Sequence, residues 1–330
     1  VFSLHIVTTT PLAYRPDFAS SLSEQRFRGF QVVMVDATST HASYAESAPT
    51  NLEFVQLRNF RQVSYARGHN QAIAFALQRW PREVWDDRYI VLTRAETAFD
   101  PACLEEILQA FRRDSDLMIA GPKMLVAEAT PPSEGDDWVE MRMTHTVYEL
   151  GYTFRKDRTL VFQGAETEDV GEQRAVQEVF GFSEPCVVIR ASALERLREG
   201  QDRWLDEAMP RGQELIDLFW RAHGQGFKIA LLPQACVWFS PAEEREQLAR
   251  RRGLYIAGPV RDKNDHALLE LMQLPWVLWG MLRSALKLLT HPRLLRERLR
   301  AWSYWRNQRD ASLRGPAPTV SLSSMRRWFL

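Results

Sequence analysis

Short apolar runs that alternate with helical segments are the feature of this chain that most restricts its fold. In the first half, runs rich in β-branched residues have the length of buried strands, at residues 2–7, 31–35, 52–57, 89–92 and 117–120. Segments with helical spacing lie between them, at 70–80 and 104–111. This alternation predicts an α/β protein with a mostly parallel sheet flanked by helices. Ligands bind beyond the carboxyl ends of strands in such sheets, so the loops after the strands are the places to look for a site.

Composition divides the chain near residue 240. The stretch 130–177 is polar and begins with Pro and Gly residues, so we interpret it as an insertion that shapes an acceptor site. A strand at 186–189, a helix at 206–223 and a strand at 228–232 then complete the globular part. We therefore predict one domain at 1–240, followed by a helical, basic and amphipathic extension at 241–330.

The extension contains an apolar run at 268–282 with Arg and Lys residues at and beyond its end. The core of this run, 274–282, is shorter than the roughly 20 apolar residues that span a bilayer. Trp276 and Trp279 beside basic residues fit a helix that lies on an anionic membrane surface. A helix packed on the domain fits the same pattern, and both alternatives remain open.

Charge and missing motifs exclude several classes of protein. The 42 basic and 42 acidic residues cancel, so we do not expect nucleic acid as a partner. No G-x-G-x-x-G, Walker loop, H-E-x-x-H or G-x-S-x-G motif occurs, which argues against dehydrogenases, P-loop proteins, zinc proteases and serine hydrolases. Cys103, Cys186 and Cys236 lie far apart and fit neither a disulfide framework nor a zinc site. No secretory signal is visible, so we predict a cytoplasmic protein. Peripheral binding to the inner face of the plasma membrane is compatible with this location.

Acidic residues at strand ends are the remaining candidates for a site. Asp36 ends a strand, where a carboxylate can accept hydrogen bonds from a nucleobase or ribose. Glu96 follows the predicted strand at 89–92 and could bind a divalent ion that bridges the two phosphates of a diphosphate. Glu214 and Asp217 share one face of a helix, so one of them could act as a general base toward a hydroxyl. A helix cap or a solvated surface group is the ordinary alternative for each.

As a series, these stretches resemble the family 2 glycosyltransferases, in particular bacterial rhamnosyltransferase-like members that act on lipid-linked glycans. The family motifs T-Y-N, V-D-N-x-S, N-x-G-F-A-x-x-N-N, L-N-P-D-T-x-x-x-P and F-D-E followed by E-D-V-D-L-x-x-R correspond to residues 8–10, 35–39, 64–71, 93–101 and 205–221. The resemblance implies a GT-A fold and an inverting transferase that moves a hexosyl or rhamnosyl group from a nucleotide sugar to a glycan or polyprenyl-linked acceptor. It also implies site residues: Thr8, Thr10, Asp36, Arg67, Asn70 and Arg94 for the nucleotide sugar, Glu96 for Mg²⁺ or Mn²⁺, and Glu214 and Asp217 for catalysis.

Three positions depart from the family pattern. Arg94 replaces the usual Asn beside the metal ligand, and it could either neutralise the diphosphate directly or pair with Glu96 and disable the metal site. Leu215 stands where the family has its base, and Trp238 to Ser240 stand where it has a His. Two hypotheses therefore follow: an active glycosyltransferase, or an inert relative that binds a nucleotide sugar or glycan as a partner subunit.

Overall fold

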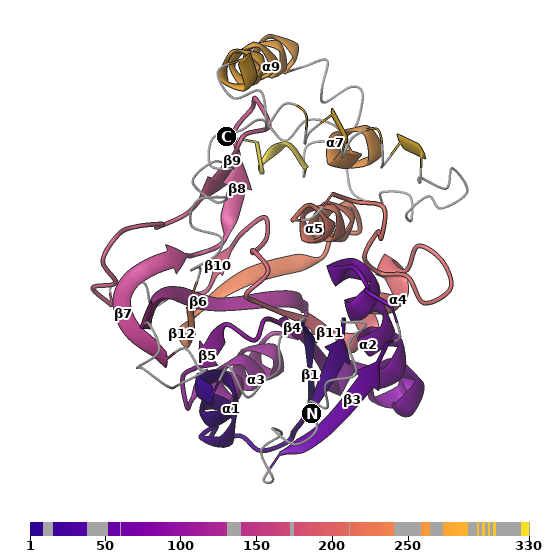
Figure 1. Ribbon diagram of the computed structural model, residues 1–330, viewed down its shortest axis with the longest axis vertical. Coiled ribbons are helices and arrows are strands. Elements are labelled where there is room, and N and C mark those ends of the chain that lie inside the picture. Colours follow the sequence, from indigo (N-terminus) through magenta and orange to yellow (C-terminus); the bar gives the residue numbers. More distant parts are fainter. Residues whose placement is uncertain are drawn as a thin grey trace.

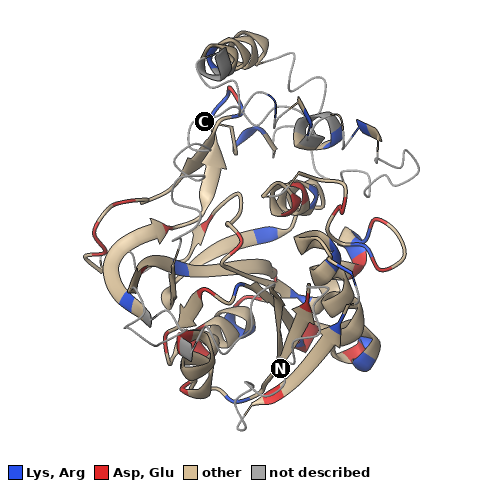
Figure 2. Cartoon of the chain, in the orientation of Figure 1, with Lys and Arg blue, Asp and Glu red and all other residues tan. Residues whose placement is uncertain are grey.

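The structure is a computed structural model, drawn as a ribbon in Figure 1 and coloured by charged residues in Figure 2. The structure describes residues 1–8, 16–37, 52–59, 61–130, 140–171, 175–210, 212–240, 259–264, 273–289 and 325–329, together with 296, 299, 300, 303, 306 and 307.

One large sheet forms the centre of the molecule (Figure 1). Its strands are β1 (Phe2–Thr8), β2 (Phe30–Asp36), β3 (Glu53–Arg58), β4 (Tyr89–Thr93), β5 (Thr97–Phe99), β6 (Leu117–Thr130), β7 (Glu140–Glu149), β10 (Gln177–Glu178), β11 (Cys186–Arg190) and β12 (Lys228–Phe239). The strand order is β10-β12-β6-β11-β4-β1-β2-β3, with β5 beside β12 and β7 beside β6. A separate hairpin is formed by β8 (Tyr152–Phe154) and β9 (Leu160–Phe162).

The predicted α/β sheet is confirmed, and its pairing is mixed. Strands β3, β2, β1 and β4 are parallel, as the alternation of strands and helices predicts. Beyond β4 the sheet departs from the mostly parallel expectation, because β11 is antiparallel to both β4 and β6. Strand β11 follows the β6–β7 hairpin and the β8–β9 hairpin rather than a crossover helix, and antiparallel strands need no such crossover.

Both faces of the sheet are covered, which is why β2 is apolar along most of its length. All seven of its residues are buried. Val33 and Val35 pack in one cluster with Ala72, whereas Val32 and Met34 belong to the larger core. Such a continuous buried run is typical of a strand that has neighbours on both faces.

The helices are α1 (Pro16–Ser23), α2 (Tyr65–Arg79), α3 (Cys103–Arg113), α4 (Ala191–Leu197), α5 (Glu214–Gly224), α7 (Pro259–Asn264) and α9 (Leu274–Leu289), with a 3-10 turn at Arg82–Asp87. Ser64 caps the start of α2, and its hydroxyl accepts a hydrogen bond from the backbone N–H of Arg67 at 3.3 Å. Gly68 lets α2 lie close to β1, since a Cβ at this position would stand 2.7 Å from the methyl carbons of Val7. The start of α2 is thereby held at the edge of the sheet where β1 ends.

Two predicted segments differ in the structure. The helix predicted at 206–223 begins only at Glu214, because Asp206 accepts a hydrogen bond from the backbone N–H of Ala208 in a turn and Gly212 has a φ of 82°. The stretch 130–177, interpreted as a polar insertion, contains β7, β8 and β9. Several exposed positions of β7 carry polar residues, so composition alone did not indicate a strand there.

The end of the chain returns to the globular body. Phe329 forms a bridge with Phe154 of β8 and stacks on its ring at a centroid distance of 5.8 Å. Helix α9 is tied to the turn before β9 by Arg283, which donates to the Asp157 carboxylate at 2.7 Å. Within the described residues, no helix is both long and apolar enough to cross a membrane. The division at residue 240 stays a prediction, and the described parts of 241–330 make these contacts with the body.

Candidate functional site

The carboxyl ends of β1 and β2 bring two predicted nucleotide-binding residues side by side. Thr8 is the register partner of Asp36, and both side chains are buried. Asp36 is in turn opposite Arg58 at the end of β3, and its carbonyl oxygen accepts a hydrogen bond from Asn59 at 3.2 Å. Thr10, the third residue predicted here, lies outside the described residues.

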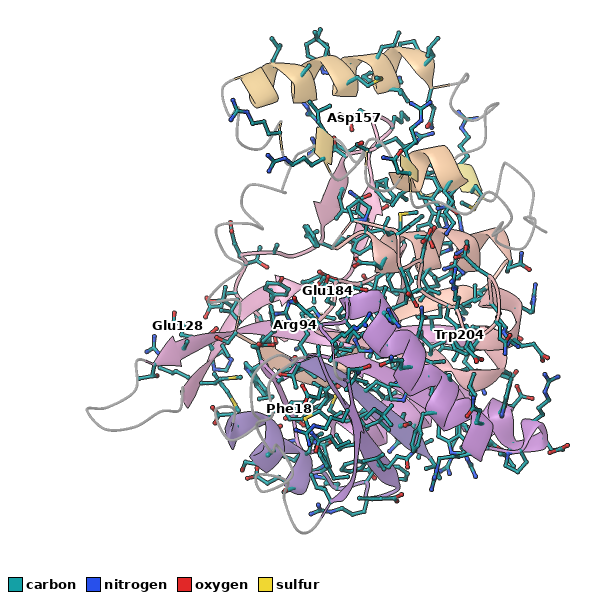
Figure 3. The ribbon with its side chains drawn as sticks, turned by 45° about the vertical axis from the view of Figure 1, so that its right-hand side comes forward. Phe18, Arg94, Glu128, Asp157, Glu184 and Trp204 are labelled. Atoms are coloured by element: carbon teal, nitrogen blue, oxygen red, sulfur yellow. The ribbon has the colours of Figure 1, made fainter. Side chains whose placement is uncertain are left out.

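Arg94 is the centre of a charged cluster at the same edge of the sheet. It follows β4, and its Nε lies 3.2 Å from the Glu96 carboxylate while its Nη1 lies 3.3 Å from the Glu184 carboxylate. The guanidinium also stands over the ring of Phe239, 5.5 Å from the ring centroid. In Figure 3 the labelled Arg94 and Glu184 lie together above the middle of the sheet, and Phe18 lies in the core beneath it. One cation is thus held between two carboxylates that come from different loops.

Glu184 is a site residue that sequence reasoning missed. It comes just before β11, and Cys186 at the start of that strand is the register partner of Thr93 at the end of β4. Because the two strands are antiparallel, the residues before β11 meet the residues after β4. No motif marks Glu184, and only the antiparallel register, which the sequence does not show, places it beside Arg94.

Glu214, at the start of α5, is a buried carboxyl on which the charge of Glu184 acts. Its side chain is buried, and its Oε2 accepts the backbone N–H of Gly212 at 2.6 Å. Burial, reinforced by the nearby charge of Glu184, raises the pKa of Glu214 to about 8. Burial, and then the charges of Glu184 and Glu214, raise the pKa of the Tyr65 hydroxyl well above its usual value. At neutral pH, therefore, Glu214 holds a proton.

Asp217, the second predicted catalytic residue, lies in a different environment. It is fully buried, and both of its carboxylate oxygens are occupied: one by Arg221 at 2.9 Å, the other by Asn264 at 2.7 Å. Lys263 adds a contact at 3.2 Å. Although burial raises the pKa of Asp217, Arg221 and Lys263 together hold it below its usual value. These surroundings suit an anchor between α5 and α7 better than a proton acceptor for a substrate.

The two predicted residues on α2 also differ from each other. Asn70 is buried, and its carbonyl oxygen accepts the backbone N–H groups of Trp204 and Leu205 at 3.0 and 2.9 Å. Its amide nitrogen donates to the Leu205 carbonyl and to Glu207. Asn70 therefore joins α2 to the loop before α5. Arg67 lies in the first turn of the helix and is exposed.

Residues at the other departures from the family pattern belong to the framework. Leu215 is 3% exposed and packs in the main core. Trp238 lies in β12, and its ring N–H donates to the Thr144 carbonyl at 3.0 Å. Neither side chain can take up or release a proton at these positions.

The residues around Glu96 do not fit a divalent metal ion. A divalent ion would have to approach a Glu96 carboxylate oxygen to about 2.0–2.6 Å. The guanidinium of Arg94 already contacts this carboxylate at 3.2 Å. Two cations on one carboxylate repel each other at such distances. Across the described parts of the chain, no group of three or more His, Cys, Asp and Glu side chains is placed to hold a metal.

Comparisons with known proteins identify the class of fold. No established family profile matches the sequence, and no curated protein is similar to it. Among solved structures, GalNAc-T7 crystallised with UDP, GalNAc and Mn²⁺ is similar with a TM-score of 0.51 and 12% identity, covering 73% of this chain and 43% of that one. The chain thus spans less than half of GalNAc-T7.

Two further structures are similar at lower scores. TarS of S. aureus has a TM-score of 0.49 and 13% identity over 85% of this chain and 70% of its own. The mannosyltransferase PcManGT from Pyrobaculum calidifontis has a TM-score of 0.47 and 15% identity over 92% of this chain and 84% of its own. The sheet described above and the likeness to GalNAc-T7 show that this chain has the GT-A fold, as predicted. Sequence identities this low show a shared fold only, so the activity must be argued from the residues of the site.

Proposed function

We propose that this chain is an inverting glycosyltransferase that moves a hexosyl or rhamnosyl group from a nucleotide sugar to a glycan or polyprenyl-linked acceptor. Bacterial surface polysaccharide synthesis is the setting that the family 2 resemblance favours. The observation that carries the proposal is the contact between Arg94 and Glu184 at the edge of the sheet where β1 and β4 end, with the buried Glu214 near enough for the charge of Glu184 to raise its pKa. Open α/β sheets bind their ligands at this edge.

The nucleotide would lie over the ends of β1 and β2. Thr8 and Asp36 are neighbours there and offer a hydroxyl and a carboxylate to a base or ribose. Arg67, exposed on the first turn of α2, can contact phosphate oxygens from the helix side. Asn70 would act indirectly, by fixing the loop at 204–207 against α2.

Glu184 and Glu214 together would supply the general base. Glu214, whose pKa is raised to about 8 by burial and then by the charge of Glu184, already holds a proton at neutral pH. The Glu184 side chain is 14% exposed, whereas Glu214 is 3% exposed. The more accessible Glu184 is the group that can reach an acceptor hydroxyl.

The reaction follows from this arrangement. The acceptor hydroxyl gives its proton to the carboxyl pair, and its oxygen forms a bond to the anomeric carbon of the donor sugar. The bond between that carbon and the phosphate oxygen breaks, and the nucleoside diphosphate leaves with the electron pair. Attack from the face opposite the leaving group inverts the anomeric centre.

A second candidate function is an inert partner subunit that binds a nucleotide sugar or glycan. It is favoured by Leu215, which fills the expected base position with a core side chain, and by Arg94, which is tied to both nearby carboxylates. Such a subunit would bind a nucleotide sugar without turning it over.

One assay separates the two functions. The protein is incubated with UDP-, GDP- and dTDP-sugars and a polyprenyl-diphosphate-linked monosaccharide, and the release of nucleoside diphosphate is followed. Turnover that is lost in Glu184→Gln but kept in Glu195→Gln, a surface variant on α4, supports the transferase. Nucleotide-sugar binding without turnover by the unaltered protein supports the inert subunit.

The membrane surface is proposed as a further partner, through α9. Trp276, Trp279 and Leu286 on this helix are each more than half exposed. Arg296 and Arg300 follow it and are exposed. An exposed apolar helix face followed in the chain by basic residues suits the interface of an anionic membrane. A cytoplasmic protein bound to the inner face of the plasma membrane, close to lipid-linked acceptors, is consistent with this surface.

A further inference from the structure

Arg94 lies where a GT-A enzyme with an acidic metal ligand after this strand would hold its cation. It is the first residue after β4 and contacts Glu96, the acidic residue predicted to bind a metal. The second carboxylate of the cluster, Glu184, reaches the same guanidinium from the loop before β11. A positive charge held between two carboxylates is the arrangement that a bound divalent ion would otherwise create.

The surroundings of Arg94 hold it in place. The guanidinium side chain is 15% exposed, so most of it is shielded from water. The ring of Phe239 lies beneath it, and the backbone N–H of Ser240 donates to the Glu96 carbonyl at 3.0 Å, which ties the Arg94–Glu96 turn to the end of β12. The backbone N–H of Thr97 bonds to the Arg94 carbonyl at 3.2 Å and closes the same turn. An arginine fixed in this way needs little rearrangement to meet an anion.

The contacts of Arg94 with the two carboxylates are long, so a phosphate group can take the place of either carboxylate. Charge-assisted N–H···O bonds are typically about 2.7–2.9 Å, whereas those of Arg94 measure 3.2 and 3.3 Å. A diphosphate offers several oxygens to the planar fork of a guanidinium, which pairs with phosphate in a bidentate way. Both carboxylates are therefore partners that a phosphate group can replace.

Resting on the proposed function, we infer that Arg94 is a built-in cation that replaces the divalent metal ion and binds the diphosphate of a nucleotide sugar without metal. The ligand class is a nucleoside diphosphate or its sugar ester. The role differs from that of a metal-bound enzyme, because the positive charge belongs to the chain and cannot be removed by a chelator.

Calorimetric titration tests the inference with UDP, GDP, ADP, CDP and dTDP as probes, once in excess EDTA and once with MnCl₂. We expect the unaltered protein to bind at least one of them with affinities that agree within about twofold in the two buffers. Arg94→Asn should lose at least about tenfold in EDTA. MnCl₂ should restore part of that loss, since Glu96 and Glu184 then face each other without a cation.

Two further variants show whether a loss of binding comes from Arg94 itself or from a general loss of folded protein. Arg94→Lys retains the charge without the fork and should bind in EDTA more tightly than Arg94→Asn. Arg82→Asn removes an arginine that pairs with Glu195 on the surface, and it should bind like the unaltered protein. Binding by the unaltered protein that requires Mn²⁺, or undiminished binding by Arg94→Asn in EDTA, overturns the inference alone. Failure of every probe in both buffers overturns the proposed function and the inference with it.

Discussion

The ammonium group of Lys263 lies 3.2 Å from the Asp217 carboxylate, so a buried ion pair ties α7 to α5. The same ammonium contacts Glu199 at 2.8 Å and Asp206 at 2.9 Å. Arg221 shares two of these carboxylates, Asp217 and Glu199. Burial raises the pKa of Glu199, against the opposing effect of Arg221 and Lys263.

Replacing Lys263 should therefore destabilise the protein strongly. Lys263→Met removes one of the two cations that hold Asp217 and Glu199, and breaking a buried ion pair costs about 3–5 kcal/mol in the free energy of unfolding. Urea denaturation measures the loss. Lys228→Met is the matched control, because the Lys228–Asp114 pair is about a third exposed and should contribute about 1 kcal/mol or less. Equal effects of the two substitutions would show that the Lys263 cluster does not hold α7 to α5.

Glu214 should make the stability of the protein depend on pH. Its folded pKa of about 8 lies above the ordinary carboxyl value of 4.5, so the folded state binds the extra proton between these two pH values. Stability contributed by this proton is present at low pH and falls as the pH rises from about 5 to 8. The total loss is on the order of a few kcal/mol.

Glu214→Gln isolates this effect, since a glutamine resembles the protonated carboxyl and can still accept the N–H of Gly212. We expect the variant to match the unaltered protein near pH 5 and to exceed its stability near pH 8.5. Urea denaturation at both pH values gives the comparison. Parallel pH profiles for the two proteins would mean that Glu214 is ionised at neutral pH, and the carboxyl-pair mechanism would lose its basis.

The sequence predicts the framework of this site better than its chemistry. The strand that ends before Asp36 and the helix predicted at 70–80 follow from local patterns, because a buried strand is apolar along its length and a helix shows its period, although α2 begins earlier, at Tyr65. Glu184 could not be predicted, since it meets Arg94 only through the antiparallel register of β11 and β4. The contacts of Asp217 depend on Lys263, which lies in a segment predicted as a separate extension. Pairings over such separations in sequence leave no local pattern.

Phe329 should stabilise the body although it lies at the end of the chain. Its ring is 3% exposed, stacks on Phe154 and lies 4.0 Å from the guanidinium of the buried Arg158. Phe329→Ala removes these contacts and leaves a cavity, so we expect a loss of about 3–5 kcal/mol. Thermal unfolding followed by circular dichroism measures it. Trp279→Ala, at a position that is 57% exposed, should change stability by about 0.5 kcal/mol or less, and a similar loss in both variants would contradict the packing role of Phe329.

The exposed face of α9 should bind anionic membranes. Gln273 and Val277 at the start of the helix are buried, and Arg283 is held by Asp157 and by the Thr159 hydroxyl, so the helix has a fixed inner side. Trp276 and Trp279 are 55% and 57% exposed. We expect the protein to sediment with vesicles of phosphatidylglycerol and phosphatidylcholine and to be released by high salt, because part of the attraction is electrostatic.

Substitutions on this face distinguish membrane binding through α9 from nonspecific adsorption to vesicles. The double variant Trp276→Ser and Trp279→Ser should lose most vesicle binding while its thermal unfolding stays unchanged, since neither ring is buried. Val170→Ser is the matched control, because Val170 is an exposed apolar residue outside α9 and its replacement should leave binding intact. Equal binding to vesicles of pure phosphatidylcholine would point to hydrophobic contact without charge recognition. If the double variant still sediments with anionic vesicles, α9 is not the contact surface, and the acceptor must reach the Glu184 edge of the sheet by another route.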